Sequence, residues 1–144
     1  MTVALSRNTP IASEAINRLR AAAWEGPQTG DWEPVLARSL GWVRATDGDG
    51  LIGFVNVAWD GGVHAFLLDT TVHPDYQRRG IGTALVREAA ALARDGGAEW
   101  LHVDYEEELA SFYRGCGFRA TTAGLLRLAV SSDAAAPEFK HECP

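Results

Sequence analysis

The segment from Val63 to Tyr105 constrains the fold more than any other part of the sequence. It begins with an apolar, strand-like run that ends at Val72 and continues into a turn that contains Gly80 and Gly82. After the glycines, apolar residues recur on one helical face, and a second strand-like run, Trp100 to Tyr105, follows. A strand, a helix and a strand in this order predict two parallel strands joined by a crossover helix.

The remaining elements extend this unit into a larger sheet. Turns rich in glycine and aspartate, such as Asp60-Gly61-Gly62, join the preceding strands, so we expect those strands to pair antiparallel. The expected strands are Val3–Arg7, Trp42–Ala45, Leu51–Trp59, Val63–Val72, Trp100–Tyr105 and Gly124–Val130, and the expected helices cover 13–23, 32–40, 81–95 and 106–114.

These elements predict an α+β fold with layers of the α/β/α type. We expect a mixed, mostly antiparallel, twisted sheet of about six to seven strands, covered by about four helices. A chain of 144 residues is long enough to bury one core, and we place a single domain at residues 1–130. Residues 131–144 are polar and contain Ala and Pro, which predicts a loose C-terminal tail.

Charge and composition restrict the partners. The formal net charge is −6, with 13 basic and 19 acidic residues, so we expect no nucleic-acid binding and favour a small cationic partner. No run of about 18 apolar residues occurs, so we expect no membrane span. Residues 1–10 do not have the pattern of a signal peptide, and the chain has two cysteines, Cys116 and Cys143. We therefore expect a cytoplasmic protein.

The glycine turn has the features of an anion site. The first amides of a helix have no intrahelical acceptor, and the helix dipole adds partial positive charge there. Gly80 and Gly82 let a bulky anion approach the backbone, which predicts a site for a pyrophosphate. Arg78 and Arg79 either add charged contacts to a phosphate or are two solvated surface side chains.

Two motifs resemble a known family. Gln77-Arg78-Arg79-Gly80-Ile81-Gly82 resembles the Q/R-x-x-G-x-G/A signature of the GCN5-related N-acetyltransferases and follows a V-x-P typical of their fourth strand, Val72-His73-Pro74. Some thirty residues later, the segment from Phe112 to Phe118 resembles the F/L-Y-x-x-x-G-F segment of that superfamily. The resemblance covers roughly Leu51 to Leu128, and the first fifty residues match only in the order of their elements.

The resemblance implies an acetyl-coenzyme A site. The backbone of Thr70, Thr71 and Val72 would pair with the pantetheine arm as a strand does. The diphosphate would bind the amides of Arg78, Arg79, Gly80, Ile81, Gly82 and Thr83. Glu106 stands where family members often have Asn; it either lines the coenzyme site or simply favours a helix N-terminus.

The resemblance assigns catalytic roles unevenly. Tyr113 stands at the position of the general acid, and a phenol with a pKa of about 10 is protonated at neutral pH. The alternative is a core tyrosine on an apolar helix face. Phe66 occupies the position of the strand glutamate that acts as base in some members. Asp69 is then the best contact for the substrate amine, directly or through a water, unless it is a structural carboxylate satisfied by backbone or arginine.

The acceptor side is less defined. Trp24 and Trp32 either line an acceptor pocket for an apolar or cationic amine or belong to the core. The spacing of His, Cys, Asp and Glu predicts no metal site. We therefore expect direct transfer from acetyl-coenzyme A to a primary amine of a small molecule. A silent coenzyme A-binding domain and acetylation of peptide N-termini are the alternatives. A homodimer formed through the exposed last strand is a further expectation.

Overall fold

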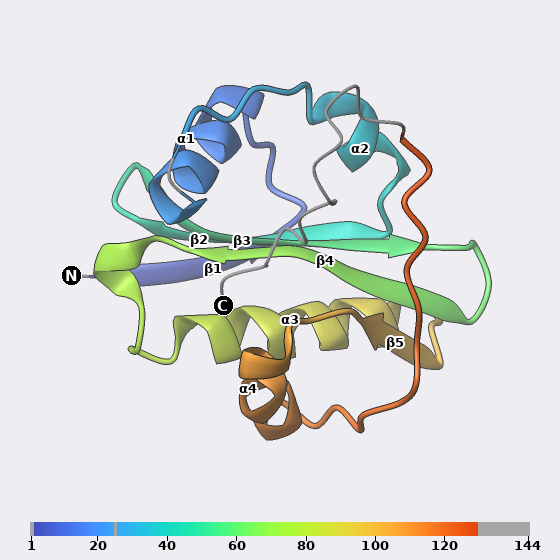
Figure 1. Cartoon of the computed structure of the whole chain (residues 1–144). Helices are drawn as coiled ribbons and strands as arrows, with labels where there is room; N and C mark the ends of the chain where they lie inside the picture. Colours follow the sequence, from blue (N-terminus) through green and yellow to red (C-terminus); the bar gives the residue numbers. More distant parts are fainter. Residues whose placement is uncertain (1, 25, 130–144) are drawn as a thin grey trace.

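The computed structural model describes residues 2–24 and 26–129 (Figure 1). Helices α1 and α2 lie on one face of the sheet, and α3 and α4 lie on the other (Figure 1). This arrangement confirms the predicted α+β fold. In chain order the elements are β1 (Val3–Arg7), α1 (Ser13–Trp24), α2 (Glu33–Arg38), β2 (Gly41–Asp47), β3 (Gly50–Trp59), β4 (His64–Val72), the 3-10 helix η1 (Pro74–Tyr76), α3 (Ile81–Asp95), β5 (Trp100–Val103), the 3-10 helix η2 (Glu107–Leu109) and α4 (Ala110–Gly115).

The strands follow one another across the sheet in the order β1-β2-β3-β4-β5. The first four pair antiparallel, and β5 pairs with β4 in parallel, which is the crossover that the segment around Gly80 and Gly82 predicts. The pairing between β4 and β5 is short. It joins His64–Leu67 to Trp100–Val103 and stops before the second half of β4. The two strands therefore part in the region where β4 leads into the glycine turn.

The larger core lies between the sheet and α3. Leu85 and Ala89 of α3 are fully buried, and they belong to one apolar cluster with Val55, Val57 and Leu67 of the sheet. Every residue of β3 from 52 to 57 is buried because helices cover both faces of the sheet at that point. Burying one large aliphatic side chain contributes about 1.5–3 kcal/mol, so this cluster fixes α3 beneath the sheet.

A smaller core attaches α1 and α2 to the opposite face. It consists of Ile16 and Leu19 of α1, Leu36 of α2 and Phe54 of β3, all buried. The Trp32 and Phe54 rings pack nearly perpendicular to each other with ring centroids 5.6 Å apart. This small core therefore holds the connection between α1 and α2 over the middle of the sheet.

The predicted last strand, Gly124–Val130, is wrong for the part that the structure describes. Residues 124–128 form no strand, and the side chains of Leu125, Leu126 and Leu128 are 61%, 82% and 84% exposed. The described sheet therefore has five strands rather than six to seven. An apolar run becomes a strand only when a neighbouring strand accepts its hydrogen bonds, and here none does. Val130 and the predicted tail, 131–144, lie outside the described residues.

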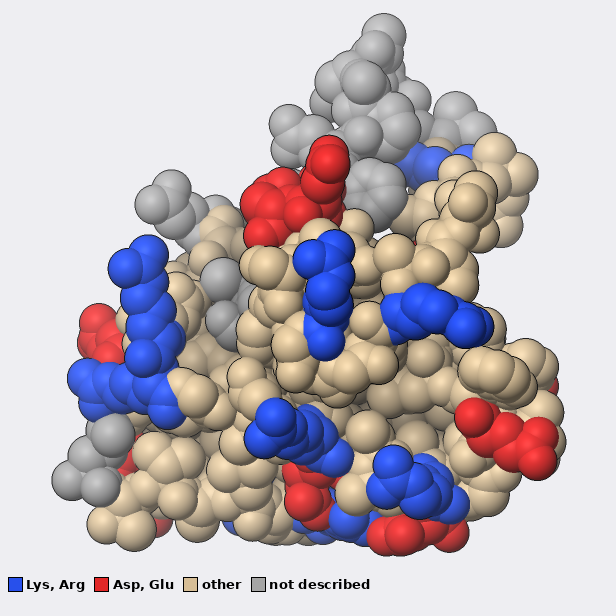
Figure 2. Space-filling view, turned by 90° about the horizontal axis from the view of Figure 1, so that it is seen from below, with Lys and Arg blue, Asp and Glu red and all other residues tan. Residues whose placement is uncertain are grey.

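Two surface properties bear on partners. In the described part of the chain no helix is both long enough and apolar enough to cross a membrane. On the face that carries α3 and α4, basic and acidic side chains are interspersed (Figure 2).

Candidate active site

The turn between β4 and α3 has the geometry predicted for an anion site. Gly80 is the N-cap of α3 and adopts a left-handed backbone conformation, with φ of +80°. A side chain is disfavoured at this φ, although a Cβ built there would meet no heavy atom within 4 Å. The amides of the first helical turn, at 81–83, have no intrahelical acceptor. The space beside Gly80 and these amides suits the close approach of a diphosphate.

Side-chain contacts hold this turn in place. The Gln77 side-chain amide donates to the Val72 carbonyl oxygen over 3.2 Å, which closes the turn onto the end of β4. The Tyr76 hydroxyl donates to the Asp47 carboxylate over 2.6 Å, which ties the turn to β2. This hydrogen bond lowers the pKa of Asp47. The Arg79 guanidinium lies 5.5 Å from the centre of the Tyr76 ring. Arg78 and Arg79 are both exposed, so both can be reached by a ligand at the turn.

The second half of β4 presents backbone to the gap between β4 and β5. In the described part of the chain, β5 pairs with β4 only as far as Leu67. The side chains of Thr70, Thr71 and Val72 are buried, so their backbone groups are what the gap offers. These are the three residues predicted to pair with a pantetheine arm, and an extended amide-bearing chain can pair with such a strand edge.

A bulge at Asp69 directs a carboxylate toward the α1 side of the sheet. Phe54 of β3 faces Thr71, but Asn56 faces Leu68, so β4 has one extra residue between these pairs. Asp69 lies in this bulge with φ of +62°, which is rare for a residue with a side chain. Bulges of this kind re-aim side chains and are common beside active sites.

Arg20 and Asn56 both contact the Asp69 carboxylate. The Arg20 guanidinium of α1 lies 3.4 Å from this carboxylate, and the Asn56 side chain hydrogen-bonds to it. The Ser39 hydroxyl donates to Asn56 Oδ1 over 2.5 Å, which leaves the Asn56 amide group to face Asp69. Burial raises the pKa of Asp69, while Arg20 and Asn56 act in the opposite direction. The dominant effect is burial, so the neutral carboxyl is favoured relative to one in water.

Arg20 also contacts Trp24 and Trp32, the two tryptophans that the sequence offers as walls of an acceptor pocket. Its guanidinium carbon lies 4.2 Å from the centre of the Trp24 ring and 5.3 Å from that of Trp32. Trp32 is oriented by Asn17, whose side-chain oxygen accepts from the indole N–H over 3.1 Å. We call Arg20, Trp24, Trp32 and Asp69 the Arg20 cluster. Its members come from α1, the connection after it and β4.

Tyr113 is a fully buried side chain of α4. Its ring stacks on Tyr105 with centroids 4.9 Å apart and meets Phe112 and Phe118 edge-on. These contacts fix the ring, so the hydroxyl has a defined position inside the protein. A proton donor with a fixed position is what general acid catalysis requires, and the same packing also satisfies the core alternative.

The end of α4 contacts the beginning of α3. Thr83, in the first turn of α3, hydrogen-bonds to the side chain of Cys116, which follows α4. The two sequence motifs, some thirty residues apart, therefore lie side by side. Burial raises the pKa of the Cys116 thiol, which disfavours the thiolate that a covalent mechanism needs.

Comparison with known proteins decides the family. A family model described as the acetyltransferase (GNAT) family matches residues 12–118, well over half of the chain. The chain belongs to the GNAT acetyltransferase family. The match includes the glycine turn, the bulge at Asp69 and Tyr113, so the GNAT resemblance inferred from the two motifs is confirmed.

Individual relatives of this GNAT chain cover parts of it. The chain is 31% identical over 68 residues to "Uncharacterized N-acetyltransferase ycf52" of Porphyra purpurea, a match that spans 47% of this chain and 39% of the relative. It is 44% identical over 57 residues to the mycothiol acetyltransferase of Mycobacterium ulcerans, spanning 38% of this chain and 17% of that protein. The matched part thus spans two fifths or less of these curated relatives.

Solved structures of GNAT proteins share the fold over almost the whole described chain. A GNAT-family acetyltransferase from Streptococcus pneumoniae TIGR4 superposes with a TM-score of 0.74 at 27% identity, covering 89% of this chain and all of that one. Glucosamine-6-phosphate N-acetyltransferase from Arabidopsis thaliana superposes with a TM-score of 0.70 at 12% identity, covering 88% and 98% of the two chains, which shows the fold alone.

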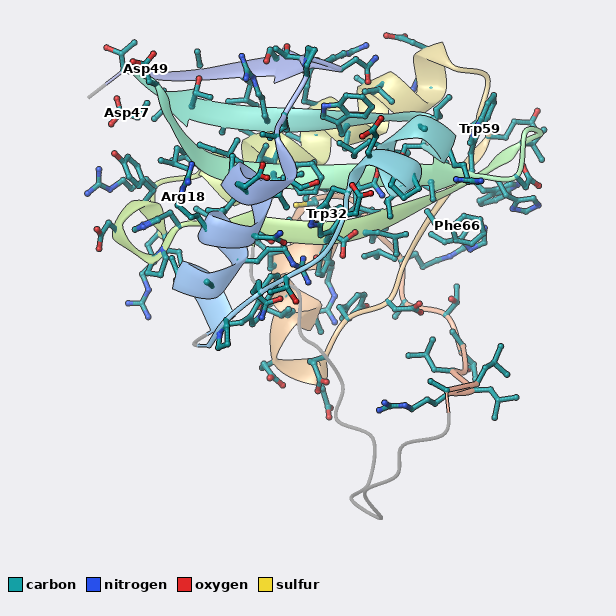
Figure 3. The ribbon with its side chains drawn as sticks, turned by 90° about the horizontal axis from the view of Figure 1, so that it is seen from above. Arg18, Trp32, Asp47, Asp49, Trp59 and Phe66 are labelled. Carbon is teal, nitrogen blue, oxygen red and sulfur yellow. The ribbon has the colours of Figure 1, made fainter. Side chains whose placement is uncertain are left out.

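Within this GNAT fold, two residues occupy positions where the sequence departs from the family pattern. Phe66 lies with Trp59 at the opposite end of the sheet from Asp47 (Figure 3) and stacks on His102, with centroids 4.7 Å apart. Glu106 is half-buried just before η2, and its carbonyl oxygen accepts from the amide of Leu109. The role of Glu106 in coenzyme binding stays a prediction. Among residues 2–24 and 26–129, no group of three or more His, Cys, Asp or Glu could hold a metal ion.

Sequence reasoning missed two contributors to this site. Arg20 is read from the sequence only as one position of an amphipathic helix, and its partner Asp69 is 49 residues away. The anchor between Tyr76 and Asp47 joins residues 29 positions apart. In each case the sequence holds only a weak signal, an ionisable residue beside apolar ones, and no spacing rule connects the partners.

Proposed function

We propose that this GNAT chain is an N-acetyltransferase that moves an acetyl group from acetyl-coenzyme A directly to the primary amine of a small molecule. One observation carries the proposal. Thr83, in the first turn of α3, hydrogen-bonds to Cys116 just after α4, and β5 pairs with β4 only as far as Leu67 in the described part of the chain. The turn at Gly80, this edge of β4 and the helix that carries Tyr113 therefore belong to neighbouring elements, which supports a donor site close to the candidate acid.

The residues at the gap fit the coenzyme. The left-handed Gly80 leaves space for a bulky anion, and the first amides of α3 supply donors to it. The backbone of Thr70 to Val72 offers strand-like pairing to an extended amide chain. Acetyl-coenzyme A supplies the activated acetyl group as a thioester.

In the proposed reaction, the neutral amine attacks the thioester carbonyl carbon with its lone pair. A C–N bond forms, the C–S bond breaks, and its electron pair leaves on sulfur. Tyr113 gives its proton to the thiolate, the acylated nitrogen loses its extra proton to solvent, and the Tyr113 phenolate takes a proton back from solvent. In this proposal Asp69 contacts the amine from the α1 side of the sheet, and Tyr113 of α4 donates to the sulfur.

Two measurements test the proposal. A ligand specific for the folded state at about 100 times its Kd stabilises by about 2.7 kcal/mol, so saturating acetyl-coenzyme A should raise the melting temperature by several degrees. Release of free thiol from acetyl-coenzyme A in the presence of an amine panel measures transfer. Binding without turnover on any amine or peptide would instead support a silent coenzyme A-binding domain, and turnover on peptides alone would support N-terminal acetylation.

A further inference from the structure

The Arg20 cluster holds opposite charges in one partly enclosed place. The Arg20 side chain is 12% exposed and the Asp69 side chain 26% exposed, so both remain in contact with solvent while most of each is buried. The two indoles lie against the guanidinium. A cation and an anion at this separation, beside flat apolar walls, match a ligand that carries both an ammonium and a carboxylate group.

One polar atom beside this charge pair, Trp24 Nε1, is buried and has no hydrogen-bond partner among the described residues. A buried polar group without a partner costs about 1–3 kcal/mol, so such atoms are rare unless something else binds them. An indole N–H is a donor only. It therefore requires an acceptor oxygen, and it lies on the ring that Arg20 covers.

The backbone at Asp69 indicates the same place. Its φ of +62° is an uncommon, strained conformation for a residue with a side chain. Asn56 of the neighbouring strand β3, positioned by Ser39, hydrogen-bonds to the Asp69 carboxylate. Strain that surrounding hydrogen bonds maintain is concentrated at functional sites. The carboxylate is thus held toward α1 at a fixed point.

We propose that the acceptor is a free α-amino acid, with its carboxylate on Arg20 and the Trp24 N–H and its amine on Asp69. This inference rests on the proposed function and names the substrate class for it. Binding exchanges one ion pair within the protein for two with the ligand, and it gives the Trp24 N–H an acceptor. The amino-acid side chain then lies against the indole of Trp32. The nitrogen reacts as the neutral amine, after one proton leaves to solvent, by the bond changes given above.

The test compares acceptors that differ only in the carboxylate. Phenylalanine and phenethylamine form one such pair, and lysine and cadaverine form another. A hydrogen bond that involves a charged group contributes about 1.5–3 kcal/mol, so kcat/KM should be about 10- to 100-fold higher for the amino acid of each pair. In the variant Arg20→Gln this ratio should fall to about one, while Arg20→Lys should retain part of it.

Arg18→Gln is the matched control. Arg18 lies on the same helix but on the other side of α1 from Trp32 (Figure 3), in a hollow with Arg44 and Asp49. This variant loses the same charge and should keep the wild-type ratio. The acetyl-coenzyme A melting shift, measured for every variant, shows that each one is folded and binds the donor.

The outcomes separate the two proposals. Turnover that favours the decarboxylated amines, or a ratio that Arg20→Gln leaves unchanged, overturns the amino-acid inference and leaves the acetyltransferase proposal standing. An equal loss of the ratio in Arg18→Gln also overturns it, because net charge would then explain the effect. Absence of turnover on every acceptor, with donor binding intact, overturns the proposed function itself.

Discussion

Replacing Gly80 with alanine tests whether the glycine turn binds the donor. Gly80 has φ of +80°, and a Cβ at this position would meet no heavy atom within 4 Å. The substitution therefore creates no clash within the protein, and its effect on stability comes from the backbone conformation alone. Gly61, in the turn between β3 and β4, provides the matched control, because its φ is +82° and its surroundings are equally open.

The two variants should lose similar amounts of stability and differ only in their affinity for acetyl-coenzyme A. An L-residue in the left-handed region costs about 1–2 kcal/mol, so Gly80→Ala and Gly61→Ala should each lower the free energy of unfolding by that amount. For a chain of this size, about 4 °C is lost for each kcal/mol, which gives a melting temperature about 4–8 °C lower for both variants. In Gly80→Ala the new methyl group occupies the space beside the helix amides. Loss of one charged hydrogen bond there weakens acetyl-coenzyme A binding at least about tenfold.

The assay is calorimetric titration with acetyl-coenzyme A, together with thermal melting of the free proteins. We expect both variants to melt lower by similar amounts, and only Gly80→Ala to bind weakly. If Gly80→Ala bound acetyl-coenzyme A as tightly as Gly61→Ala does, the assignment of the turn as the diphosphate site would be wrong. A much larger loss of stability in one variant would show that φ does not determine the cost.

Two further predictions concern the catalytic side of the gap. Tyr113→Phe should lower kcat about 100-fold with an unchanged Kd for acetyl-coenzyme A, because general acid catalysis typically contributes a factor of about 100 to 10,000. The control Tyr105→Phe, in the same aromatic cluster, should leave kcat unchanged. An unchanged kcat in Tyr113→Phe would remove Tyr113 from the mechanism. In the folded protein the pKa of Asp69 lies above its ordinary value of 3.8. The protonated carboxyl therefore contributes stability that is fully present below pH 3.8 and is lost as the pH rises through the higher folded-state pKa. Urea unfolding at about pH 4 and about pH 7 should therefore show Asp69→Asn gaining stability relative to the wild type as pH rises, whereas a difference that moves the other way would mean that the Arg20 ion pair outweighs burial.

The glycine turn and helix α3 could be predicted from the sequence because their determinants are local. The backbone at the start of α3 is left-handed, a conformation that favours glycine, and Gly80 lies there. The apolar residues of α3 repeat with the helical period. The bounds of β1 match the prediction, and those of β3 and β4 agree within one residue at each end. Each of these features depends on residues within a few positions of one another, where steric preference and periodicity act directly.

The last predicted strand shows where local pattern fails. The leucines near Leu126 have the apolar character of a strand, yet these side chains remain exposed and the segment is unpaired in the described part of the chain. Apolar character records a preference for burial, whereas a strand also needs a neighbour to accept its backbone hydrogen bonds. The homodimer expected through this segment stays a prediction.

The sequence by itself determined the order of the elements, the glycine turn and the GNAT motifs, because these follow from backbone sterics, helical period and short spacings. Only the tertiary structure decided that Arg20 meets Asp69, that Tyr76 anchors on Asp47, and that Thr83 lies beside Cys116. Each of these contacts joins residues on different elements. Their geometry depends on how the buried faces pack, and packing is a property of the whole core rather than of any segment.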